Sequence, residues 1–272
     1  MQPVPVLTYH ATNVAGNDYA RNDHVALAED LRVIDDGGYR IVPLVDVVAA
    51  VLEGAPLPEK AVAITLDDGT DFDYEDLVFD EHGIQRSMMN VLRDFIAERG
   101  GNRQPTLSVT SFVIASPTAR AELDRDCLLG RGRFGERWWQ AAVASGLFGI
   151  ANHGWDHNHP ASSEAASRGT TGTFKTICDH DVAHLEVRRA RDYIAGVAPN
   201  PAVDLFAYPY GESNAFLVDD YFPRGYAHTG TRAAFTTEPR HVTDDASPWL
   251  LPRYVCGAHW RSTGELVRLL RR

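Results

Sequence analysis

Short apolar runs alternate with helical segments along almost the whole chain, and this alternation limits the fold more than any other feature. Strands are expected at residues 4–9, 39–44, 61–66, 107–114, 148–152, 203–208 and 250–255, with two weaker runs at 226–229 and 233–236. Helices are expected at residues 24–38, 47–53, 84–99, 136–145 and 180–195, and from residue 263. This order predicts an α/β fold, an incomplete or distorted (β/α) barrel of about seven parallel strands with crossover helices.

The composition limits the partners of the chain. The 272 residues contain 26 Lys and Arg against 37 Asp and Glu, a net charge of −11, which argues against nucleic acid and anionic membranes. No apolar run approaches the ~18 residues of a membrane span, and the N-terminus shows no signal peptide. The three cysteines are too scattered for a disulfide framework or a CxxC site. No low-complexity linker divides the chain, so residues 1–272 are expected to form one domain.

The apolar run at residues 61–66 ends abruptly at Asp67-Asp68-Gly69. A buried strand should carry charge only where the charge is paired or holds a metal, so both acids are expected at the mouth of the barrel. Adjacent side chains on a strand point to opposite faces, so one acid could bind a cation while the other serves as a base. The alternative is an ordinary turn, because Asp-Gly is a common turn dipeptide.

Two histidines four residues apart, His153 and His157, follow the expected strand at 148–152. On one helical turn both imidazoles reach the same ion, and two His with one Asp are typical of a catalytic zinc site. Asp156 lies between them and could orient one ligand, and His159 ranks below His157 as an alternative ligand. Two ordinary loop histidines are the alternative interpretation.

His180 and His184 have the same spacing, with Glu186 nearby. They fall in an expected crossover helix, away from the strand ends, so a solvated polar face is the preferred interpretation there.

The residues best suited to catalysis or metal binding come directly after apolar runs. Besides the two acids and the histidine pair, these are His10 and Tyr210. In α/β barrels the chemistry collects at the carboxyl ends of the strands, so this placement predicts an active site. The Pro209 and Gly211 turn could aim the Tyr210 backbone N–H at an oxyanion, although an ordinary loop is the alternative.

These motifs resemble the polysaccharide deacetylase family, carbohydrate esterase family 4, with its NodB-like domain. Thr65-Leu66-Asp67-Asp68-Gly69 is similar to the first family motif, Thr-Phe-Asp-Asp-Gly. The resemblance implies Asp67 as the catalytic base and Asp68 as a metal ligand. The segment from His153 to His157 resembles the second motif, His-Ser/Thr-x-x-His, and implies both histidines as ligands. Gly154 stands where that motif has a hydroxyl that would brace the ligand loop.

The segment Phe206 to Gly211 resembles the third motif, but Ala207 replaces its usual arginine. The variant Phe-Ala-Tyr-Pro-Tyr-Gly is similar to the branch that includes poly-N-acetylglucosamine deacetylases. That branch implies Arg253, on a later strand, as the residue that orients the base. It also implies His10 as the general acid, with His259 as the alternative.

The resemblance implies a hydrolase of carbon–nitrogen bonds that removes acetyl groups from a glycan, most simply from N-acetylglucosamine units. One divalent ion is expected, Zn²⁺ or alternatively Co²⁺, Mn²⁺ or Ni²⁺, and the partner is a glycan or acetylated sugar. The family suggests the cell envelope or the exterior of the cell. An acetylxylan esterase, a small-amide hydrolase and a non-catalytic glycan-binding protein are the alternatives.

Overall fold

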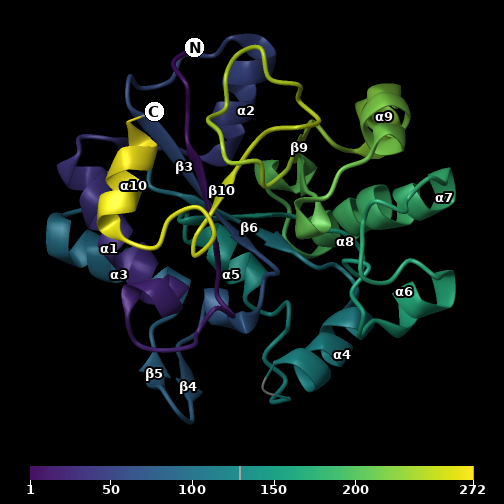
Figure 1. Cartoon of the computed structure of the whole chain (residues 1–272), viewed down its shortest axis with the longest axis horizontal. Helices are drawn as coiled ribbons and strands as arrows, with labels where there is room; N and C mark the ends of the chain where they lie inside the picture. Colours follow the sequence, from purple (N-terminus) through teal and green to yellow (C-terminus); the bar gives the residue numbers. More distant parts are fainter. Residues whose placement is uncertain (129, 272) are drawn as a thin grey trace.

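The computed structural model describes residues 1–128 and 130–271, and a sheet of parallel strands curved into a barrel forms its centre (Figure 1). The strands are β1 (Val6–His10), β2 (Arg40–Ile41), β3 (Ala61–Asp67), β6 (Val109–Val113), β7 (Phe148–Asn152), β8 (Leu205–Ala207), β9 (Ala233–Phe235) and β10 (Tyr254–Val255). Their order is β10-β1-β3-β6-β7-β8-β9, with β2 pairing to β3. Leu251, just before β10, bridges in parallel to Phe235 of β9. The two edges of the sheet therefore approach each other, and the distorted (β/α) barrel is confirmed.

Helices pack around this sheet. They are α1 (Asp23–Asp36), α2 (Leu44–Glu53), α3 (Met88–Arg99), α4 (Pro117–Cys127), α5 (Trp139–Ala144), α6 (Ser163–Arg168), α7 (His180–Ala183), α8 (Ala190–Val197), α9 (Tyr226–Thr229) and α10 (Thr263–Leu270). Short 3₁₀ and π segments are η1 (Tyr19–Arg21), η2 (Asp71–Asp73), η3 (His184–Arg189), η4 (Pro201–Asp204), η5 (Pro209–Gly211), η6 (Phe216–Tyr221) and η7 (Phe222–Arg224). Helices α1, α3 and α10 lie side by side next to β1 and β3 (Figure 1).

The alternation of side chains along β3 divides the core into two layers. Val62, Ile64 and Leu66 pack with the outer helices α1, α3 and α10. Ala61 and Ala63 belong instead to a second cluster with inward-facing residues of the other strands and with α2. Because the side-chain period of a strand is two, Asp67 continues the inward row. The strand thus carries one of its two acids into the barrel.

Three local expectations were wrong. Residues 226–229 form α9 rather than a strand, and Gly225 and Gly230, both with positive φ, lie at its two ends. No helix was expected between residues 114 and 136, but α4 lies there, capped by Ser116 and beginning at Pro117. The expected helix at 84–99 begins only at Met88, where Ser87 caps α3.

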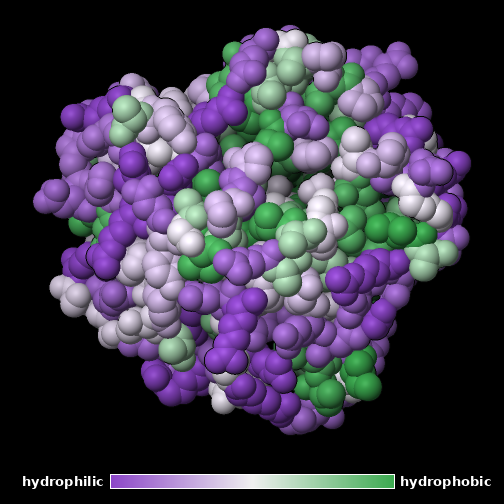
Figure 2. All heavy atoms as spheres, turned by 180° about the vertical axis from the view of Figure 1, so that it is seen from behind, coloured by the Kyte–Doolittle hydropathy of each residue, from purple (hydrophilic) through white to green (hydrophobic). Residues whose placement is uncertain are grey.

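A β-hairpin precedes α3, formed by β4 (Leu77–Phe79) and β5 (Gly83–Gln85). Val78 and Ile84 lie directly opposite each other in it and are 54% and 74% exposed. Seen from behind, most of the surface is hydrophilic, and apolar atoms gather at the lower edge where this hairpin projects (Figure 2). Among the described residues no helix has the length and hydrophobicity needed to cross a bilayer.

Gly69 ends β3 in a turn that has no room for a side chain. Its φ is +73°, and a Cβ placed on it would lie 2.3 Å from Cγ1 of Val113 on the adjacent strand β6. The backbones of the two neighbouring strand ends therefore approach each other closely at the mouth of the barrel.

We expect Gly69→Ala to lower the free energy of unfolding by about 2–5 kcal/mol, because the change adds a clash to an unfavourable φ. Gly38→Ala is the matched control, since Gly38 has a φ of +74° and nothing within 4 Å of its Cβ position. That control should cost only about 1–2 kcal/mol. Urea denaturation followed by circular dichroism measures both losses, and equal losses would contradict the close approach at Gly69.

Candidate active site

The acids that end β3 lie in different surroundings. The Asp67 side chain is 4% exposed and faces the barrel interior, whereas the Asp68 side chain is 28% exposed. Asp68 has a left-handed backbone conformation with φ +76°, so the chain turns at this residue. One carboxylate is therefore enclosed by protein, and its neighbour is open to solvent and ligands.

Asp67 forms a bidentate ion pair with Arg253, which is fully buried. Arg253 Nη1 donates to Asp67 Oδ1 at 2.7 Å, and Nη2 donates to Oδ2 at 2.9 Å. The guanidinium also donates to Thr65 Oγ1 and to the Thr236 carbonyl oxygen. Burial acts to raise the pKa of Asp67, but Arg253 and His153 outweigh it and hold that pKa well below its usual range. Asp67 is therefore ionised and has a fixed orientation.

Asp68, His153 and His157 bring one carboxylate oxygen and two imidazole nitrogens within 4.8 Å of one another. Asp68 Oδ1 lies 3.8 Å from His153 Nε2 and 4.0 Å from His157 Nε2. His153 Nδ1 lies 2.9 Å from the carbonyl oxygen of Ala207 on β8. A proton on Nδ1 would donate to that oxygen and leave Nε2 as the ligand, the arrangement common to metal-bound histidines.

The chemistry of these donors suits a transition-metal ion. Burial and the neighbouring His153 lower the pKa of His157 well below its ordinary value, so its imidazole is neutral, the form that coordinates metal. One carboxylate and two imidazoles, with further positions open, match catalytic Zn²⁺ sites. Residues Asp68, His153 and His157 therefore fit the ion that the family motifs imply.

His10 and Tyr210 also lie at this site. His10 ends β1 directly opposite Asp67 in the strand register, and its positive charge would contribute to the low pKa of that acid. Tyr210 follows β8 with φ +59°, and its ring centroid lies 4.5 Å from that of His157. His259 lies beyond β10, where its Nδ1 accepts a hydrogen bond from the Val255 N–H. Both candidates for the acid are present, but only His10 ends a strand adjacent to β3.

His159 and His180 are not part of this donor group. The ring centroid of His159 is 6.2 Å from that of His157, and its Nδ1 accepts the Ala161 N–H. On α7, His180 Nε2 lies 3.3 Å from Asp220 Oδ2. Among the described residues, only the Asp68 group brings three donors of this kind together.

The sequence did not predict the burial or the contacts of two acids near the site, Asp73 and Glu186. Asp73 accepts a hydrogen bond from Ser111 Oγ at 2.6 Å, and burial, with Asp68 and Asp67 nearby, raises its pKa well above the ordinary value. The polar residue Ser111 in the middle of a buried strand was the only signal for this partner. Glu186, expected on a solvated helix face, is instead completely buried against the loop that carries His157.

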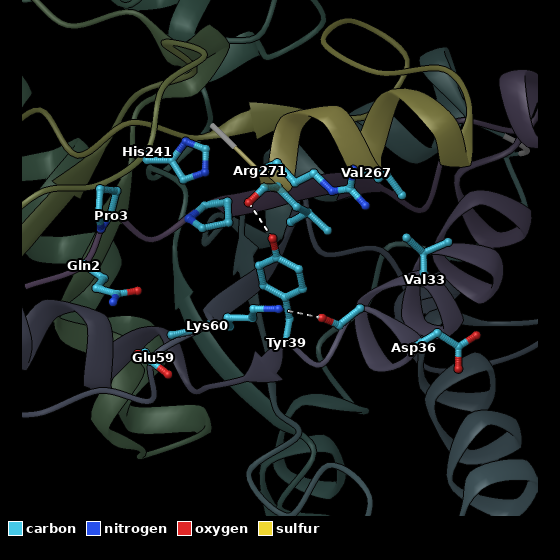
Figure 3. A pocket seen from close by; sticks show the side chains of 14 residues that line it. Gln2, Pro3, Val33, Asp36, Tyr39, Glu59, Lys60, His241, Val267 and Arg271 are labelled. Carbon is cyan, nitrogen blue, oxygen red and sulfur yellow. Dashed lines mark hydrogen bonds between the residues drawn. The ribbon is translucent and has the colours of Figure 1, made fainter.

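A separate cavity of about 640 Å³ lies near the amino ends of β1 and β3, at the opposite end of the barrel (Figure 3). Tyr39 and Lys60 line it and donate to the carbonyl oxygens of Leu270 and Gly37. Its walls contain none of the predicted site residues, so cavity size alone does not locate the chemistry in this barrel.

Replacing Arg253 by Met should lower the free energy of unfolding by about 3–5 kcal/mol at pH 7, because it leaves the Asp67 charge buried without a partner. The double change Asp67→Asn with Arg253→Met should recover part of this loss. Arg32→Met is the control, since Arg32 forms a multiply hydrogen-bonded pair with Glu98 at the surface. Exposed pairs contribute about 0–1 kcal/mol, so equal losses for the two arginines would contradict the argument.

A protein-family model described as polysaccharide deacetylase matches residues 54–227 of the chain. The comparison with curated proteins gives no match.

Solved structures with this fold include three bacterial proteins. IcaB from Ammonifex degensii has a TM-score of 0.67 at 19% identity, over 99% of this chain and 97% of that one. The Streptococcus pyogenes deacetylase PplD in complex with acetate gives 0.67 at 16%, over 98% of each chain. BC0361, a polysaccharide deacetylase from Bacillus cereus, gives 0.62 at 17%, over 99% and 69%. These identities support the fold alone. Because the family model matches more than half of the sequence, the chain belongs to the polysaccharide deacetylase family, hydrolases of carbon–nitrogen bonds other than peptide bonds.

Proposed function

We propose that this protein is a metal-dependent hydrolase that removes acetyl groups from a glycan containing N-acetylglucosamine. The observation that carries the proposal is the position of Asp67, an ionised carboxylate, beside a donor set for a cation. Asp67 Oδ2 lies 3.9 Å from His153 Nε2, and that nitrogen lies 3.8 Å from Asp68 Oδ1. A base next to a cation site is the arrangement that hydrolysis of an amide requires.

Asp68, His153 and His157 would hold the ion, which when bound polarises the acetyl carbonyl and makes water more acidic. Asp67 accepts a proton from the attacking water, and Arg253 keeps that carboxylate ionised and turned toward the site. His10 donates a proton to the departing amine. The Tyr210 backbone N–H, at the turn after β8, donates to the oxyanion that forms on the acetyl group.

The substrate class is supported by the family and by two residues. Ala207 on β8 replaces the arginine of the common third motif, and Arg253 reaches Asp67 from the segment before β10. This combination resembles the branch with poly-N-acetylglucosamine deacetylases. An acetylxylan esterase or a small-amide hydrolase would use the same residues, so acetylxylan and small cyclic amides are the comparison substrates. A non-catalytic glycan-binding protein would need no base.

The unaltered protein loaded with Zn²⁺ should release acetate from N-acetylglucosamine oligomers faster than from acetylxylan or small cyclic amides. Asp68→Ala and His157→Ala should each remove bound zinc and activity, because each deletes a donor. Zinc content by elemental analysis and acetate release measure the two effects.

His180→Ala is the matched control, because it removes one member of the other histidine pair with the same spacing. It should retain full zinc content and activity. Full zinc in the Asp68 or His157 variant would overturn the ligand assignment, and glycan binding by zinc-loaded protein without acetate release would overturn the proposed catalysis.

Asp67→Asn should keep its zinc but lose at least about 100-fold in kcat, because an amide cannot take the proton. His10→Ala should also retain zinc and lose about 10²–10⁴-fold, the range for general acid catalysis. His259→Ala serves as the comparison and should leave kcat near that of the unaltered protein. A large loss for His259→Ala with none for His10→Ala would assign the acid to His259 instead.

A further inference from the structure

The loop that carries both histidine donors has a backbone conformation that few residues adopt unaided. Gly154, His157 and Asn158 have φ values of +91°, +63° and +47°. A residue other than glycine in this region costs about 1–3 kcal/mol and remains there only when surrounding contacts fix it. The loop therefore needs contacts that hold it from outside its own sequence.

The brace expected from the family motif is absent, because Gly154 has no hydroxyl. A Cβ on Gly154 would lie 2.9 Å from Glu186 Oε2 and 3.5 Å from Pro209 Cγ. The carboxylate of Glu186 thus fills the space beside Gly154 where a serine or threonine side chain would begin. The absence of a side chain at Gly154 therefore leaves the room that the buried Glu186 carboxylate occupies.

Glu186 is bonded to the backbone in the middle of the loop. It is completely buried, and Oε2 accepts the Trp155 N–H at 2.9 Å and the Asp156 N–H at 3.4 Å. Its other oxygen, Oε1, accepts from Arg168 Nη2 at 2.8 Å. Both oxygens of this acid are therefore used in holding the segment between His153 and His157.

Arg168, at the end of α6, links Glu186 to the second half of the loop. Its Nη2 also donates to Asp156, at 2.9 Å to Oδ1 and 2.7 Å to Oδ2. Asp156 in turn accepts the Asn158 N–H at 3.0 Å through Oδ1 and the Ser162 hydroxyl at 3.2 Å through Oδ2. The chain of contacts therefore reaches the residues on both sides of His157.

Glu186 belongs to η3, a π-helical segment that contacts the loop at two further points. Asn152 Nδ2 donates to the Val187 carbonyl oxygen at 2.7 Å, and Asn152 Oδ1 accepts the Gly154 N–H at 2.9 Å. The guanidinium of Arg189 lies 4.2 Å from the centre of the Trp155 ring. A π-helix leaves i→i−4 bonds unmade and is frequent at functional sites. Here Glu186, Val187 and Arg189 of this segment all contact the ligand loop or the end of β7 that precedes it.

We propose that Glu186 and Arg168 are positioning residues for the cation site, which fix the loop so that His153 and His157 face Asp68. Neither residue touches a donor atom, so they act through the loop backbone and through Asp156. The inference rests on the proposed function in one respect, that these three donors bind a divalent cation. Outer-shell partners of this kind set the orientation of metal ligands and hence the affinity.

The test is the affinity of the purified full chain for Zn²⁺ alone, measured by competition with a chromophoric chelator. Glu186→Ala and Arg168→Met should each weaken Zn²⁺ binding by about 10–100-fold. Glu186→Gln should bind more tightly than Glu186→Ala by at least about threefold, because an amide oxygen can still accept from the backbone N–H groups. With Co²⁺ as the probe, the visible spectrum of the Ala variant should also change, since it reports ligand geometry.

Asp35→Ala is the matched control. Asp35 is 4% exposed and accepts hydrogen bonds from Arg103 and Gln104, so its removal also deletes a buried, arginine-paired acid, but one remote from the ligand loop. This variant should lose stability without losing Zn²⁺ affinity. If it weakens Zn²⁺ binding as much as Glu186→Ala does, the effect is general destabilisation and the inference fails.

The outcomes separate this inference from the proposed function. If the unaltered protein binds no Zn²⁺, both fail. If it binds Zn²⁺ and folded Glu186→Ala binds as tightly, only the positioning role fails. If Glu186→Ala does not fold, Arg168→Met decides, because Arg168 is partly exposed and its replacement keeps most of the side-chain volume.

Discussion

The carboxylate of Asp67 and the guanidinium of Arg253 meet inside the barrel, where both side chains are buried. Moving either charge alone into such a place costs several kcal/mol, so each depends on the other. The pair joins β3 to the segment that leads into β10. It contacts Thr65 of β3, Phe112 of β6 and Thr236, which directly follows β9. The interaction that orients Asp67 thus also connects parts of the barrel wall that are far apart in the sequence.

Around this pair the backbone adopts unusual conformations at the candidate site. The residues other than glycine with positive φ in the described part of the chain are Asp68, His157, Asn158 and Tyr210, and all lie in loops at the carboxyl ends of β3, β7 and β8. Strained backbone persists where surrounding structure determines it. The ion pair, the Gly69 turn and the Glu186 network are such structure, so the donors are held in place before any ligand arrives.

The barrel and most of its strands follow from apolar runs, because burial on both faces leaves little choice of residue there. The strand-end rule then placed His10, Asp67, Asp68, His153 and Tyr210 at one edge. Local rules failed where tertiary contacts decide the outcome.

One such case is residues 226–229, whose apolar composition suits a strand but which form a single helical turn. Another is Glu186, because the spacing of its neighbours His180 and His184 describes a helix surface and says nothing about which polar residue faces the core. Arg253 lies between these two cases, because it was predicted but not from a local pattern. Its partnership with Asp67 could be expected only from the family resemblance, since no local pattern connects two positions 186 residues apart.

That separation affects the order of assembly during synthesis. Asp67 leaves the ribosome long before Arg253 does, so the nascent chain must keep the end of β3 hydrated while the middle strands are made. Asp67, at the end of the inward row of β3, gains its ion-pair partner only when the segment before β10 supplies Arg253. The final fifth of the polypeptide therefore completes the barrel interior, and a shortened chain would leave Asp67 without the guanidinium that pairs with it.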